Sequence, residues 1–179
     1  MLLPHDQAMR FIEAYKAALL EVLAMEHIEQ TGSVIENLAK ARDLVAKAPD
    51  LLDGAIKRTT NQGIQIEPDV LLAIRSLRVS HWVFLRQNRI SAIFIDQAVQ
   101  NSYSVKALTT PLDQVVSPVP CVFKAGVFTF LGYHVCDGII QDFVGLGPGY
   151  RSQFNAAYAQ IRTAGRHHGK ADEVGKPIA

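Results

Sequence analysis

Three side chains that could do chemistry together lie within four residues, as His134, Cys136 and Asp137 in the segment 131–140. A thiolate beside an imidazole is a strong nucleophile. The surrounding residues, however, alternate as in a β-hairpin that turns near the start of this segment. In that register His134 and Cys136 share one face, Asp137 lies on the other, and Cys136 faces Val127. We therefore predict that Cys136 is a buried, inert thiol.

The glycine-rich segment that follows, GLGPG at residues 145–149, differs from a dinucleotide-binding loop. Its spacing is not G-x-G-x-x-G, and Pro148 removes one amide that would bind a phosphate. A single helix and a tail follow it, so the further strand of a βαβ unit is missing. We predict a flexible corner between sheet and helix, and no cofactor.

A metal site is not expected either. The adjacent His167 and His168 have no cysteine or carboxylate at ligand spacing, and the chain contains no H-E-x-x-H or C-x-x-C motif.

His81 and Asp96 form the best candidate for a catalytic pair. His81 falls on the apolar side of an alternating run from residue 77 to 86, and a turn at Asn88–Arg89 would place it opposite Asp96. A carboxylate that orients a histidine is typical of general bases. The alternative is a structural core histidine, for which Asp96 compensates the loss of hydration on burial. No activated nucleophile accompanies the pair.

The other side of the same run predicts a binding surface. Arg78, Trp82 and Arg86 alternate along it together with Phe84, and Arg89 lies at the turn. Aromatic rings between arginines can stack on bases and contact phosphates, so a protein or a nucleic acid is the expected partner. The alternative is that helices dock on Trp82 and Phe84.

The secondary structure that must position these residues is predicted to change along the chain from helices to strands. Residues 1–66 show helical periodicity, with a helix from about Asp6 to Glu26 and a second one that starts at a capping box, Ser33 to Glu36. The second helix is expected to bury Ile35, Leu38, Leu44 and Val45. From residue 67 to 165 the period is mainly two, and a last helix follows from residue 151.

This order predicts an α+β fold, with N-terminal helices, a five-stranded, mostly antiparallel sheet and a C-terminal helix. The expected strands cover residues 77–86, 90–96, 103–108, 119–130 and 133–141. Residues 166–179 are expected to be a flexible tail.

Composition limits the class of protein. Hydrophobic residues make up 49% and charged residues 20% of the 179 residues, as in globular proteins. Residues 1–68 carry seven Lys or Arg against ten Asp or Glu, and the remainder carries eleven against seven. Neither part is basic enough to identify a nucleic-acid binder. No stretch resembles a signal peptide or a membrane span, and the two cysteines are expected to be free thiols, so we predict a cytoplasmic protein without membrane contact. A hydrophobic edge on the hairpin at residues 119–140 favours a homodimer.

Three short motifs are similar to a pattern in uncharacterised bacterial proteins. They are Ala92–Asp96 (AIFID), Leu108–Leu112 (LTTPL) and Asp137–Ile139 (DGI), within a region from about residue 82 to 140. The resemblance implies a sheet. It implies no activity.

Two functions follow from these observations. The favoured one is a non-enzymatic binding or regulatory module that uses the arginine and aromatic surface. The alternative is a small hydrolase or isomerase with His81 as base and Asp96 as the residue that orients it.

Overall fold

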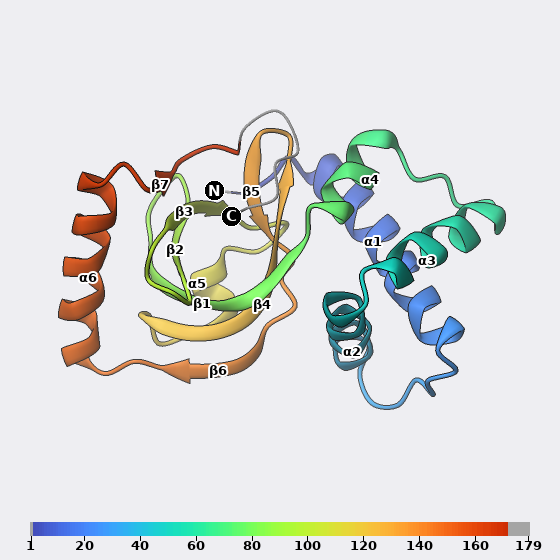
Figure 1. Cartoon of the computed structure of the whole chain (residues 1–179), viewed down its shortest axis with the longest axis horizontal. Helices are drawn as coiled ribbons and strands as arrows, with labels where there is room; N and C mark the ends of the chain where they lie inside the picture. Colours follow the sequence, from blue (N-terminus) through green and yellow to red (C-terminus); the bar gives the residue numbers. More distant parts are fainter. Residues whose placement is uncertain (1, 172–179) are drawn as a thin grey trace.

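The structure, a computed structural model, describes residues 2–171 and has a helical part, a barrel and a final helix (Figure 1). The helical part contains α1 (His5–Met25), α2 (Val34–Lys47), α3 (Asp50–Asn61) and α4 (Pro68–Arg75). Of the predicted tail, residues 172–179 lie outside the described residues. No helix in the described part is both long and apolar enough to cross a membrane.

Local sequence explains where the helices start. Ser33 caps α2 through the predicted capping box, because its hydroxyl accepts from the Glu36 amide and the Glu36 carboxylate accepts from the Ser33 amide. Pro68 occupies the first turn of α4, where its missing N–H needs no partner. α4 packs with α1 in the core of the helical part.

The strands form one sheet that closes on itself. They are β1 (Arg78–Gln87), β2 (Ala92–Asp96), β3 (Ser102–Lys106), β4 (Cys121–Phe130), β5 (Tyr133–Cys136) and β6 (Gln141–Gly145), with the short β7 (His167–His168) on β3. The order is β1-β2-β3-β5-β4-β6, and β1 also pairs with β4. The ring β1-β2-β3-β5-β4 is therefore a five-stranded barrel, in which β3 and β5 are parallel and all other contacts are antiparallel.

The α+β class with a mostly antiparallel sheet is confirmed, but the count of five strands is too low. The two additional strands are β6, which begins at the last residue of the expected hairpin strand and ends at the first residue of the expected corner, and β7, which lies in the expected tail. β6 pairs with β4 although β5 lies between them in the sequence, and β7 has only two residues and pairs with the distant β3. The hairpin register was predicted correctly, since Cys136 lies opposite Val127.

Aromatic side chains fill the interior of the barrel. Trp82, Phe84, Phe94, Tyr103 and Phe123 are all buried there and contact one another through their rings. The short helix α5 (Leu112–Val115), with the adjoining Val116, contributes to the same core.

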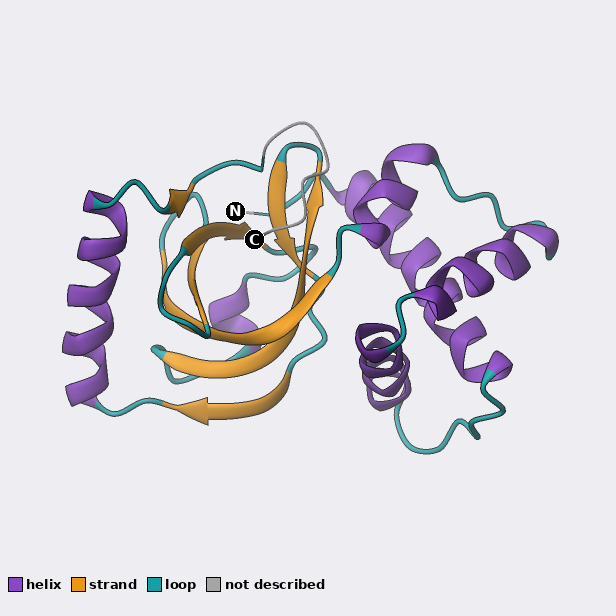
Figure 2. Ribbon diagram, in the orientation of Figure 1, coloured by secondary structure: helices purple, strands orange, loops and turns teal. Residues whose placement is uncertain are grey.

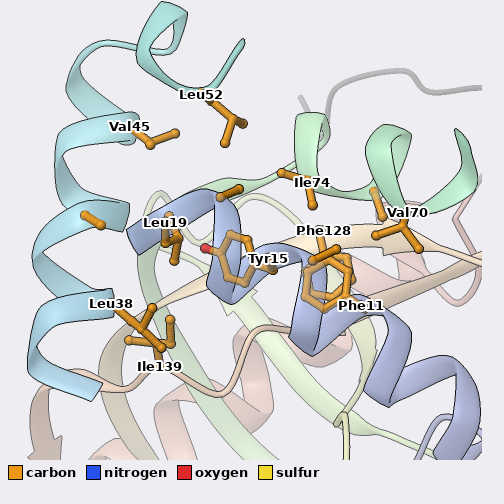
Figure 3. Packing of buried hydrophobic residues seen from close by; sticks show 14 of the residues in the cluster. Phe11, Tyr15, Leu19, Leu38, Val45, Leu52, Val70, Ile74, Phe128 and Ile139 are labelled. Atoms are coloured by element: carbon orange, nitrogen blue, oxygen red, sulfur yellow. The ribbon is translucent and has the colours of Figure 1, made fainter. Parts of the chain in front are cut away.

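Two different elements cover the outside of the barrel (Figure 2). α6 (Pro148–Thr163) lies against β1 and β2, where Tyr158 and Ile161 pack on Val83, Ile93 and Ile95. The helical part lies on the opposite side and packs on β4 and β5. There the Phe11 ring of α1 stacks on Phe128 of β4 with their centroids 3.9 Å apart (Figure 3).

Candidate functional site

His81 and Asp96 do not form the predicted pair. Trp82, not His81, lies opposite Asp96, because the connection between β1 and β2 covers residues 88–91 and is longer than the predicted turn, and the β-bulge between Phe84 and Arg86 offsets only one residue of the resulting shift. A shift of one residue moves each side chain to the other face. His81 instead lies partly exposed, with its Nε2 3.4 Å from Oδ2 of Asp142.

Asp96 closes the turn between β2 and β3. Its Oδ1 accepts from the Gln100 amide at 2.8 Å, and its Oδ2 accepts from the backbone and side-chain amides of Asn101 at 3.1 and 2.9 Å. These contacts explain the buried carboxylate as a structural feature of the turn.

The predicted arginine and aromatic surface is also not formed. Trp82 is completely buried inside the barrel, and the Arg78 guanidinium lies 5.5 Å from the centre of its ring. Beyond the bulge Arg86 points to the outer side, where it stacks on Tyr158 of α6. The central carbon of its guanidinium group lies 5.1 Å from the centre of the Tyr158 ring. Arg86 and Arg89 are exposed, and their binding of a protein or nucleic acid stays a prediction.

α6 covers part of the outer face of the barrel. Tyr158 and Ile161 of α6 cover Ile93 and Ile95 on the outer face of β2. This part of the face is therefore not available as a stacking surface.

A buried ion pair joins the helical part to the barrel. Arg42 of α2 and Asp137, which follows β5, both have fully buried side chains, with Nη1 3.1 Å from Oδ2. Arg42 also donates to the Ile139 carbonyl and to the Gln141 side chain. Such hydrogen bonds are needed because the removal of two charges from water carries an unfavourable desolvation free energy.

The Asp137 carboxylate has further donors. Its Oδ1 accepts from the amides of Gly126 at 3.1 Å and Ile139 at 3.0 Å, and its Oδ2 lies 3.5 Å from the Tyr15 hydroxyl. Burial raises the pKa of Asp137, and the Arg42 charge opposes that change. Gly126 is required here, because a Cβ at this position would lie 2.4 Å from Oδ2 of Asp137.

An apolar pocket of about 250 Å³ lies next to this ion pair, between the helical part and the barrel. Four segments line it: α1, the start of α2, the segment from β3 to α5, and the residues after β5. The buried part of the lining is mostly apolar and consists of Phe11, Tyr15, Leu38, Ala107, Leu108, Leu112, Cys136, Asp137 and Ile139. Leu38 and Ile139 approach each other from α2 and from the loop after β5 (Figure 3).

The mouth of this pocket combines apolar and polar side chains. Ile35 of α2 and Val115 of α5 are 53% and 46% exposed, although Ile35 was predicted to be buried. Lys16, Thr109 and Thr110 complete the mouth and are exposed as well. The pocket therefore has an apolar interior and a mouth at which exposed apolar side chains lie beside polar ones.

The ionisable groups inside the pocket are held in structural roles. Burial raises the pKa of the Cys136 thiol, which keeps it protonated and a poor nucleophile. Burial also raises the pKa of Tyr15, whose hydroxyl faces Asp137. Among residues 2–171 no group of three or more His, Cys, Asp or Glu side chains could hold a metal ion.

Tyr15, Lys16 and Arg42 were not among the site residues predicted from the sequence. One signal was present: Arg42 follows Leu38 by four residues and precedes Val45 by three, so it lies on the apolar side of α2. A charged residue on an apolar helix face indicates a buried ion pair. The sequence offered no comparable signal for the pocket, because its lining comes from four distant segments.

Comparison with known proteins leaves the site to be interpreted from its geometry. The sequence matches no protein-family model, and no match was found among curated proteins or solved structures.

Proposed function

We propose that this chain is a non-enzymatic binding module whose site is the pocket between the helical part and the barrel, and that it binds a small, largely apolar molecule. The observation that carries the proposal is the apolar cavity of about 250 Å³ with an exposed apolar rim. Well-formed apolar pockets with a few polar groups are the usual location of ligand sites. Exposed apolar side chains around an opening also favour an interaction site.

The state of the polar groups favours binding over catalysis. The donors from Arg42, Gly126, Ile139 and Tyr15 already surround the Asp137 carboxylate, so it has little capacity left to act on a ligand. The neutral Cys136 thiol and the Tyr15 hydroxyl then offer a ligand dipoles and no reactive charge.

Calorimetric titration of the full chain with 1-octanol, a neutral apolar probe, tests the proposal. The substitution Ile35→Trp should block the mouth and abolish binding. Val34→Trp is the matched control, because Val34 is the adjacent residue, is 54% exposed and does not line the pocket. Binding that is absent in the wild type, or equal in both variants, would contradict the proposal.

We also propose a homodimer, for a different reason from the predicted one. β4 pairs with β1 on one side and with β5 and β6 on the other, so the hairpin leaves no open edge there. Within the described residues β6 pairs with β4 alone and carries the exposed Phe143 and Val144. An open apolar edge strand readily pairs with a second copy. Light scattering should give a dimer mass for the wild type and a monomer mass for Val144→Lys; a monomeric wild type would refute the dimer.

The two thiols support a further proposal, a reducing compartment such as the cytoplasm. Cys121 and Cys136 are both free and buried.

A further inference from the structure

We propose that the ligand of the pocket between the helical part and the barrel is an apolar carboxylic acid whose carboxylate binds Lys16 at the mouth. This inference rests on the proposed function and specifies its ligand. It follows from the distribution of charge around the pocket, from the polar atoms at the mouth and from the size of the interior.

The lining residues carry two charges of opposite sign in different places. Asp137 lies at the buried side, and Arg42 compensates its charge there. Lys16 lies at the exposed side, and within residues 2–171 its ammonium group has neither an ion pair nor a hydrogen bond. The available charge of the pocket is therefore positive and lies at its mouth.

The other polar atoms at the mouth suit an anion as well. The hydroxyl groups of Thr109 and Thr110 can donate hydrogen bonds to a carboxylate. A single ammonium group is a compact charge that matches one carboxylate. A cationic ligand would meet Lys16 as a like charge.

The interior limits the size and polarity of the rest of the ligand. A cavity of about 150 Å³ holds benzene, so 250 Å³ accommodates roughly ten non-hydrogen atoms. Leu38, Leu108 and Ile139 offer the ligand no hydrogen-bonding side chains. A medium-length alkyl chain or a single aromatic ring satisfies both conditions, and octanoate is a suitable probe.

The test is calorimetric titration of the full chain at pH 7 with three probes of equal chain length: octanoate, 1-octanol and octylamine. We expect the order octanoate, 1-octanol, octylamine from tightest to weakest. Lys16→Met should weaken the affinity for octanoate about two- to fivefold, the effect of one exposed ion pair, and leave the affinity for 1-octanol unchanged. Lys16→Glu should weaken the affinity for octanoate further and strengthen that for octylamine. Lys40→Glu is the control for net charge, because Lys40 lies on the exposed side of α2 and does not line the pocket.

The outcomes separate the two proposals. If 1-octanol binds as tightly as octanoate, or if Lys16→Met leaves octanoate unchanged, the carboxylate assignment is wrong while the binding function stands. If octylamine binds most tightly, the sign of the charge is wrong. If none of the three binds, both proposals fail.

Discussion

Removal of Arg42 should destabilise this protein more than any substitution of a surface charge. In Arg42→Met the aliphatic stem is kept, but the Asp137 carboxylate stays buried without its cation. Both side chains are 0% exposed, and Nη1 lies 3.1 Å from Oδ2. The loss of one partner from a buried pair costs about 3–5 kcal/mol. For a chain of this length that corresponds to a fall in Tm of about 10 °C.

The control and the assay use features of the same chain. Arg75→Met removes the ion pair with Asp53, whose side chains are 51% and 63% exposed, and should cost less than about 1 kcal/mol. Urea unfolding can be followed by the fluorescence of Trp82, the single tryptophan, and by circular dichroism of the helices. Both signals should shift together, because the helices pack in one hydrophobic cluster with the outer side chains of β4 and β5, two strands of the barrel that encloses Trp82. If Arg42→Met lowered the free energy of unfolding no more than Arg75→Met does, the stabilising role of the buried pair would be refuted.

The pH dependence of this variant gives an independent check. Burial raises the pKa of Asp137, and without Arg42 it should rise further above the unfolded value of about 3.9. Between the unfolded and folded pKa the folded state binds more protons, so its stability increases as the pH falls. Arg42→Met should therefore recover part of its lost stability between pH 7 and about pH 4. The double variant Arg42→Met/Asp137→Asn should be more stable than Arg42→Met at pH 7, because no charge remains buried.

Three further predictions concern the same framework. Gly126→Ala should cost about 1–3 kcal/mol in urea unfolding, because its Cβ would lie 2.4 Å from a carboxylate oxygen, whereas Gly169→Ala, where the Cβ would meet open space, should be nearly neutral. Cys121 and Cys136 should react with a thiol reagent at pH 8 only as fast as the chain opens, since burial raises the pKa of Cys121 to about 12 and also raises that of Cys136; rapid labelling of the native chain would contradict this. Ser33→Ala should cost about 1 kcal/mol through loss of the capping box, and an unchanged urea midpoint would argue against that cap.

Local patterns in the sequence predicted local structure well. The capping box at Ser33 and the hairpin register that places Cys136 opposite Val127 are both confirmed. Each depends on residues close in sequence, where side-chain alternation or hydrogen bonding is decisive. The α+β class follows from the same kind of signal.

Features that depend on contacts between distant residues could not be predicted from such patterns. The length of the connection at residues 88–91 and the bulge after Phe84 leave no trace in the alternation of residues, yet together they set the register that separates His81 from Asp96, and the bulge places Arg86 on the outer side. Closure of the barrel through β1 and β4 moves Trp82 from a predicted surface into the core. The pocket likewise exists only after the helical part docks on the barrel.

The most direct test of ligand binding in the pocket between the helical part and the barrel is an NMR measurement of nuclear Overhauser effects between bound 1-octanol and the methyl groups of the chain. We predict contacts to Leu38, Leu108 and Ile139, which line the pocket. Contacts confined to exposed apolar side chains elsewhere, such as Leu72 and Ile90, would contradict binding in this pocket.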